Sequence, residues 1–147
     1  MSNVIRIVIA NSDHLFVDKL AAFLQAQTNI QVVGTAFDGP GAIELCADTL
    51  PDVALLGLHL PGVDGIKSAR SILGTNAQIS ILIIASGQNN GADEYALQAL
   101  KTGTRGYLPP SASLTTVAQA IQQVYDGGVY LPAGLASLML NEFDRLP

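Results

Sequence analysis

Two histidines follow short apolar stretches of the sequence, His14 four residues after the stretch 4–10 and His59 directly after the stretch 53–58. Imidazole nitrogens bind metal ions and exchange protons near neutral pH. If both stretches are neighbouring parallel strands, the two rings lie at the carboxyl edge of one sheet and could form a metal or ligand site. No third ligand is evident beside them, and solvent-facing histidines without a chemical role are the alternative interpretation.

Cys46 is the only cysteine of the 147-residue chain. One thiol excludes a disulfide framework and a cysteine-rich zinc site. Cys46 stands inside a segment of helical pattern, between Leu45 and Ala47, where a small buried hydrophobic residue is expected. The chain also lacks a Gly-Lys phosphate-binding loop and a G-x-S-x-G motif, so these two common enzyme signatures are absent.

The composition is that of a globular domain with few charges. Hydrophobic residues make up 49% of the chain and charged residues 13%, whereas a charged share of about 25% is usual. The net charge is −5 and the seven Lys and Arg residues are scattered, which argues against nucleic-acid binding by this segment itself. No apolar run approaches the roughly 20 residues that span a bilayer, and the first residues lack a signal-peptide pattern. We therefore expect one cytoplasmic domain with no membrane contact.

Five short apolar blocks alternate with longer segments of helical period. The blocks are β-branched or Leu-rich and nearly continuous in hydrophobicity, as in strands buried on both faces. This alternation predicts an α/β fold, with a doubly wound, five-stranded parallel sheet in a three-layer α/β/α arrangement. Such a sheet leaves a crevice at the carboxyl ends of its strands, where sites usually form. The predicted strands are residues 4–10, 30–36, 53–58, 79–85 and 105–108.

Apolar stripes and helix-capping residues mark the helices between and after these blocks. Pro40 suits the first turn of the second helix, and Ser113 and Gly127 suit the start and the end of the last helix of the repeat. Residues 131–143 predict one further short helix, interpreted as a linker or a dimer contact, with the apolar stripe Leu135, Leu138 and Met139. The expected division is a domain of residues 1–130 and a linker of residues 131–147. The stripes of the first and last helices are Phe16, Leu20, Phe23 and Leu24, and Leu114, Val117, Ile121 and Val124.

Several sequence blocks occur in the order found in one known family. They are IRIVIA, VVGTAFDGPGAIEL, PDVALLGLHLPGVDG, ALQALKTGTRGYL and GGVYLPAGLASLML, and they extend from about Ile5 to the region after Tyr130. In these blocks the chain resembles the receiver domain of bacterial two-component response regulators, most closely that of the NarL/FixJ class. The resemblance implies a flavodoxin- or CheY-like fold with a role in signal transduction and transcription regulation. It implies DNA contact only through an output domain outside this chain.

A working receiver accepts a phosphoryl group on an aspartate. The resemblance implies a carboxylate at the end of the third strand, an acidic pair after the first, a Thr or Ser after the fourth and a Lys after the fifth. The carboxylates hold Mg²⁺, and the metal and the lysine neutralise charge on the transferred group. In this chain the corresponding positions hold Gly57, Asn11 with Ser12, Ala85, and Pro110, or Pro109 if the loop shifts by one residue.

None of these positions carries the side chain that the phosphorylation chemistry needs. The sequence therefore predicts a degenerate receiver that is not an enzyme, holds no metal or other cofactor and cannot be phosphorylated by the family mechanism. Asp13 and Ser86 stand one residue past the expected positions, but Asp13 is interpreted as a first-turn carboxylate that suits the helix dipole. Asp52 at the start of a strand and Asp64 in a turn are also interpreted as structural.

Regulation by binding is the leading functional hypothesis. A constitutive homodimer, or a response to a protein partner, would use Tyr107 and the Leu135, Leu138 and Met139 stripe. The resemblance implies that contacts use residues 95–101, 105–108 and 114–125, and that Tyr107 is the aromatic residue that changes rotamer when an active receiver is phosphorylated.

Ligand sensing is the alternative hypothesis, and phosphorylation of an unrecognised residue is the least favoured one. Loss of the charged groups leaves a neutral crevice that could accept an uncharged or weakly polar metabolite. Its expected lining is Asn11, Ser12, Asp13, Gly57, His59, Ala85 and Ser86.

Overall fold

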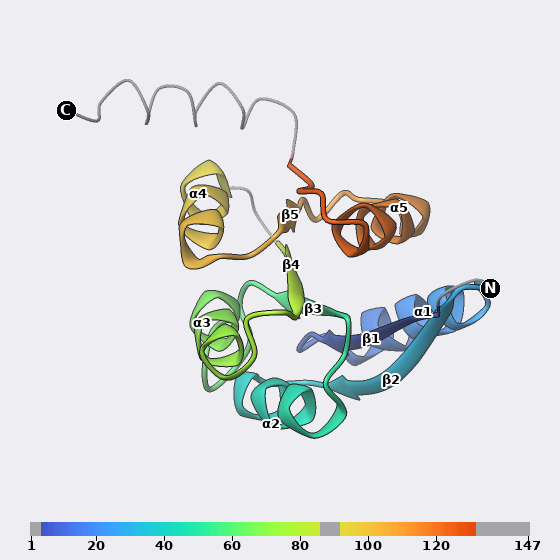
Figure 1. The fold of residues 1–147 in the computed structure, drawn as a ribbon, viewed down its shortest axis with the longest axis horizontal. Helices are drawn as coiled ribbons and strands as arrows, with labels where there is room; N and C mark the ends of the chain where they lie inside the picture. The colour runs from blue at the N-terminus through green and yellow to red at the C-terminus, as the bar shows by residue number, and fades with distance from the viewer. Residues whose placement is uncertain (1–3, 86–91, 132–147) are drawn as a thin grey trace.

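The five apolar blocks form one parallel sheet with the strand order β2-β1-β3-β4-β5 (Figure 1). The computed structural model describes residues 4–85 and 92–131. Its strands match the predicted ones to within one or two residues at each end, and the doubly wound α/β fold class is confirmed. The strands are β1 (Ile5–Ala10), β2 (Ile30–Ala36), β3 (Val53–Gly57), β4 (Ser80–Ile84) and β5 (Gly106–Leu108).

The helices cover both faces of the sheet, because each strand must cross to a parallel neighbour through a helix. Helices α1 and α5 pack on one face, and α2, α3 and α4 pack on the other, where their apolar side chains form two separate buried layers. β3 lies at the centre of the sheet and is buried along its whole length. The helices are α1 (His14–Gln25), α2 (Gly39–Thr49), α3 (Gly65–Thr75), α4 (Ala92–Thr102) and α5 (Leu114–Tyr125).

The predicted apolar stripe of α1 is partly wrong. Val17, Leu20 and Leu24 are buried, at the spacing i, i+3 and i+7 that lies on one helix face, whereas Phe16 and Phe23 lie at the border of the core and are half-buried. The two phenylalanines made the neighbouring helix face look apolar in the sequence, although they only border the core. In α5 the predicted stripe is confirmed, apart from Leu114, which is half-buried.

Helix ends agree with the capping residues expected from the sequence. The Ser113 hydroxyl accepts a hydrogen bond from the Thr116 amide at the start of α5, and Pro40 stands in the first turn of α2. Gly127 follows Asp126, the C-cap of α5, and adopts a φ of 96°, a left-handed conformation that glycine reaches without strain. None of the described helices is long and apolar enough to cross a membrane.

The outer edge of β5 is covered by the segment that follows α5. The Tyr107 amide donates to the Tyr130 carbonyl at 3.1 Å, and the Tyr130 amide donates to the Arg105 carbonyl at 2.9 Å. Tyr130 thus pairs in parallel with Gly106, beyond the last strand of the sheet. Because these edge groups are already hydrogen-bonded, β5 does not offer a bare edge there for pairing with another chain.

Cys46 is buried against the sheet from α2, as expected, with 1% of its surface exposed. Burial raises the pKa of its thiol from 9.0 to about 11, since the thiolate is poorly solvated there. Between pH 9.0 and about pH 11 the thiol therefore keeps its proton in the folded state, whereas it has lost that proton in the unfolded state. Its contribution to stability is complete below pH 9.0 and is lost as the pH rises toward 11.

We accordingly expect the free energy of unfolding to fall by up to about 1.4 kcal/mol per pH unit above pH 9 from this group alone. Denaturant unfolding of the wild type and of Cys46→Ala over this alkaline range measures it, and the difference between the two curves isolates the thiol. Parallel curves for the two proteins would contradict the assignment.

Candidate functional site

The carboxyl edge of the sheet is formed by uncharged residues at the ends of four strands. Asn11 directly follows β1, Gly57 ends β3, Ala85 directly follows β4 and the Pro109-Pro110 pair follows β5. β1 and β3 are hydrogen-bonded neighbours, and so are β3 and β4, so Asn11, Gly57 and Ala85 lie on adjacent strands. The structure therefore brings these three predicted site residues together.

Asn11 occupies the space into which a side chain at position 57 would extend. A Cβ atom placed on Gly57 would lie 3.0 Å from Asn11 Nδ2 and 3.4 Å from Asn11 Cγ. Asn11 is 7% exposed, and its Oδ1 accepts a hydrogen bond from the Asp13 amide at 2.9 Å. The Asn11 amide is thus held by a local turn with its nitrogen directed toward Gly57.

Three carboxylates near this edge are used as helix caps. Asp13 caps α1 through the Phe16 amide at 3.1 Å, and Asp64 caps α3 through the Lys67 amide at 2.8 Å. Asp38, which the sequence analysis did not single out, caps α2 in the same way. The expectation of Asp13 in the first helical turn is corrected: it precedes α1 as the N-cap and bonds an amide directly. Its short side chain, three residues before Phe16, is the local signal for this role.

Among the residues that the structure describes, neither Asp52 nor Ser12 takes part in a cluster of acidic side chains. Asp52 Oδ2 accepts from the Arg6 amide at 2.8 Å, at the opposite, amino-terminal edge of the sheet. Ser12 is exposed between β1 and α1. Within the described part of the chain, no group of three His, Cys, Asp or Glu side chains could hold a metal ion.

The two histidines contact different aromatic residues. The His14 ring stacks on Phe37 with a centroid separation of 3.7 Å, at the β2 side of the sheet. The His59 ring meets Tyr95 of α4 edge-on, with centroids 5.8 Å apart. Both imidazoles are exposed and each has its own neighbour, so the structure does not support a shared two-histidine site. Neither aromatic partner could be found from sequence spacing, because each comes from a distant element.

Tyr107 lies in the core beneath α4. It is 2% exposed and belongs to the apolar layer on the α2, α3 and α4 face. In this conformation its ring packs in the protein's own core. The other residues predicted for the interface, Leu135, Leu138 and Met139, and the predicted crevice residue Ser86, lie outside the described residues.

The fold and the carboxyl-edge geometry define a CheY-like receiver domain, in which a (βα)5 repeat presents loops from neighbouring parallel strands at one edge. The chain belongs to the response regulator receiver domain family, whose sequence model matches residues 7–122. It is similar to the transcriptional regulatory protein LnrK of Bacillus subtilis, with 28% identity over 141 residues that cover 96% of this chain and 63% of LnrK.

Solved structures give the same result. The receiver domain of NarL from Mycobacterium tuberculosis is 30% identical, with a TM-score of 0.78, over 85% of this chain and 98% of that one. A LuxR-family response regulator from Aurantimonas sp. is 25% identical, with a TM-score of 0.85, over 97% of this chain and all of that one. This chain spans 63% of the length of LnrK and 60% of the length of DegU of Brevibacillus brevis. These two relatives are named as transcription regulators, not as enzymes.

Proposed function

We propose that this receiver domain belongs to a cytoplasmic transcription regulator and acts through protein contacts without being phosphorylated. The observation that carries the proposal is the neutral, filled carboxyl edge, where the Asn11 amide stands 3.0 Å from the Cβ position of residue 57. Phosphoryl transfer needs a nucleophile, and Gly57 provides no side chain. It also needs concentrated positive charge around the transferred group, held in place by carboxylates.

The surrounding residues do not supply a replacement nucleophile, cation or pair of metal-binding carboxylates. One carboxylate oxygen in each of three aspartates accepts a hydrogen bond from an amide at the start of a helix. These aspartates are Asp13, Asp38 and Asp64. After β5, Pro109 and Pro110 replace a cationic side chain and remove two backbone donors. A magnesium ion beside Asn11 would therefore find neutral oxygens and at most the second oxygen of a capping carboxylate, which is a weak ligand set for a hard cation.

The test is exposure of the chain to Mg²⁺ and acetyl phosphate, followed by intact mass spectrometry. We expect no mass increase from a phosphoryl group, while a receiver that carries the aspartate gains one under the same conditions. Amide NMR spectra recorded in parallel are expected to show no saturable shifts at Asn11 and Gly57. A stoichiometric phosphoryl adduct would contradict the proposal. If it is sensitive to hydroxylamine it is an acyl phosphate, and Asp13 would be the first residue to substitute; if it is acid-stable it lies on a hydroxyl side chain.

Self-association through α4, β5 and α5 is the contact that we propose for signalling. These elements lie together at one side of the sheet, with α4 and α5 on either side of β5 (Figure 1). Tyr130 covers the β5 edge through main-chain hydrogen bonds, so contact there must involve side chains rather than strand pairing. Val129, next to Tyr130, is 42% exposed and supplies an apolar side chain at this side.

Val129→Asp is accordingly expected to weaken self-association about tenfold, because a carboxylate would be desolvated in the contact. Sedimentation velocity over a dilution series measures the dissociation constant. Val4→Asp is the matched control: Val4 is 48% exposed but precedes β1, from which β5 is separated by β3 and β4. A wild type that stays monomeric at high concentration, or an equal loss in both variants, would contradict the proposed contact.

Binding of a metabolite in the neutral crevice receives less support from the geometry. The side chain that the family pattern would place at position 57 is missing, but the Asn11 amide occupies the adjoining space. Asn11, Gly57 and Ala85 are all buried. A ligand seated there would have to displace Asn11 and break its hydrogen bond to the Asp13 amide.

A further inference from the structure

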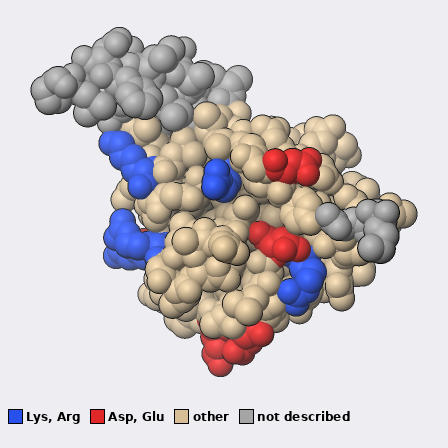
Figure 2. Space-filling view, in the orientation of Figure 1, with Lys and Arg blue, Asp and Glu red and all other residues tan. Residues whose placement is uncertain are grey.

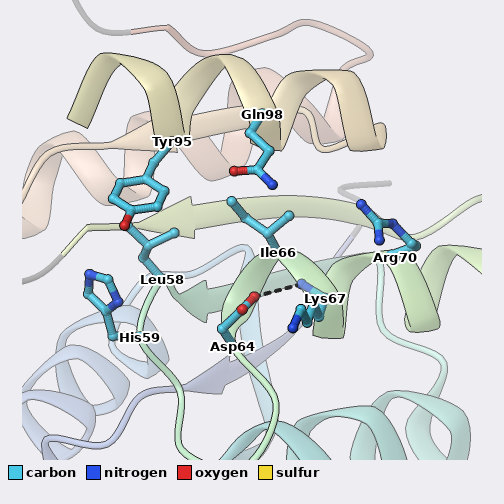
Figure 3. A pocket seen from close by; sticks show the side chains of 8 residues that line it. All are labelled: Leu58, His59, Asp64, Ile66, Lys67, Arg70, Tyr95 and Gln98. Atoms are coloured by element: carbon cyan, nitrogen blue, oxygen red, sulfur yellow. Dashed lines mark hydrogen bonds between the residues drawn. The ribbon is translucent and has the colours of Figure 1, made fainter. Parts of the chain in front are cut away.

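A pocket of about 160 Å³ lies between α3 and α4 (Figure 3), and its lining includes Leu58 and His59, which directly follow Gly57 at the carboxyl end of β3. Its base is apolar, and its walls carry two cations from α3 and polar side chains from α4 and the β3–α3 loop. Figure 3 shows Tyr95 and Gln98 extending from α4 toward α3. The lining residues are Leu58, His59, Asp64, Ile66, Lys67, Arg70, Tyr95 and Gln98.

The two cations in this pocket have no acidic partner among the described residues. Lys67 and Arg70 are three residues apart on α3, so they are neighbours on one helix face, where like charges repel. Asp64, the one carboxylate among the described lining residues, caps α3 through the Lys67 main-chain amide at 2.8 Å rather than pairing with either side chain. In a chain with so few charges (Figure 2), two adjacent unpaired cations beside a cavity favour an anionic ligand.

The other wall of the pocket is suited to a flat apolar body. His59 meets Tyr95 edge-on with ring centroids 5.8 Å apart, and both rings line the pocket. Leu58 and Ile66, each 4% exposed, form the base between these rings and the cations. An apolar cavity of roughly 150 Å³ holds one benzene molecule, so the pocket has room for about one six-membered ring.

We propose that the α3–α4 pocket binds a small aromatic carboxylate. The carboxylate would pair with Arg70, whose planar guanidinium can bind it in a bidentate manner, and with Lys67. The ring would lie over Leu58 and Ile66 beside Tyr95, and Gln98 would reach a polar ring substituent. Binding would join α3 to α4 and does not require a phosphoryl group at the carboxyl edge.

Benzoate is the probe for this proposal, in an amide NMR titration of the wild-type chain. We expect saturable shifts at Leu58, Ile66 and Tyr95, and a dissociation constant about tenfold higher in Arg70→Gln, which loses the charge-assisted hydrogen bonds. Lys67→Gln should weaken binding in the same direction. Lys19→Gln is the matched control, because Lys19 is exposed on α1, which packs on the opposite face of the sheet.

Two further ligands separate the contributions of charge and ring. Benzyl alcohol has the ring without the charge, and inorganic phosphate has the charge without the ring, so both are expected to bind far more weakly than benzoate. Absence of saturable benzoate shifts at these residues would overturn the proposal. So would equal affinity for either analogue, or an affinity unchanged by Arg70→Gln while the spectrum of the variant shows an intact fold.

Discussion

Gly65→Ala is expected to destabilise the domain by about 3 kcal/mol, at the upper end of the cost of overpacking a buried site. Gly65 opens α3 and lies against the end of β3, where its amide donates to the Leu58 carbonyl at 2.9 Å. A Cβ atom on Gly65 would overlap the Gly57 carbonyl oxygen and lie 3.1 Å from the Leu58 Cα. These are backbone atoms, so no side-chain rotation relieves the overlap, and either α3 or the end of β3 must move.

Gly74→Ala, near the other end of the same helix, is the matched control. A Cβ atom on Gly74 would meet no atom within 4 Å, and alanine lowers the entropy of the unfolded chain, so this variant is expected to gain about 0.5 kcal/mol. Urea unfolding of both variants measures the two changes. A decrease of less than about 1 kcal/mol in the free energy of unfolding of Gly65→Ala would contradict this, because it would mean that α3 and β3 can move apart at little cost.

Gly57→Asp is expected to destabilise the folded domain at neutral pH without restoring a magnesium site. The new carboxylate would be buried beside Asn11, with its Cβ 3.0 Å from Asn11 Nδ2. No lysine follows β5, where Pro109 and Pro110 stand. Burial without a cation raises the pKa of a carboxyl group, and we expect a loss of about 1–3 kcal/mol at pH 7 relative to an uncharged side chain of the same shape.

Gly57→Asn provides that uncharged comparison, because it places the same Cβ against Asn11. The expected difference between the two variants is largest at neutral pH. It disappears as the pH falls through the raised pKa toward the unfolded value of about 3.9, since both states are then protonated. Denaturant unfolding from acid to neutral pH, with and without excess Mg²⁺, tests this. Equal stability of the two variants at all pH values, or strong stabilisation of Gly57→Asp by Mg²⁺, would show that the edge still accommodates an acidic metal site.

The alternation of apolar blocks and helical stripes in the sequence is sufficient to determine the fold class. Strands such as β3 and β4 are continuous apolar runs in the sequence because helices cover both of their faces. The helix ends could be located from Ser113 and Pro40, since capping depends on residues only a few positions apart. Residue identity alone also established that Gly57 offers no nucleophile and that Asn11 and Ala85 are uncharged.

Relations between distant segments were decided only by the tertiary structure. The Asn11 amide fills the space beside Gly57, His14 stacks on Phe37 and His59 meets Tyr95, although 23 or more residues separate each of these pairs in the sequence. Tyr130 covers the β5 edge, and α3 and α4 line a pocket whose cations have no acidic partner among the residues that the structure describes. Local propensity and periodicity act over a few residues, and they fix which elements form. Which side chains meet depends on sheet order and helix packing. The sequence could therefore place Asn11 in the lining of a neutral crevice, but it could not show that its amide occupies the space beside Gly57.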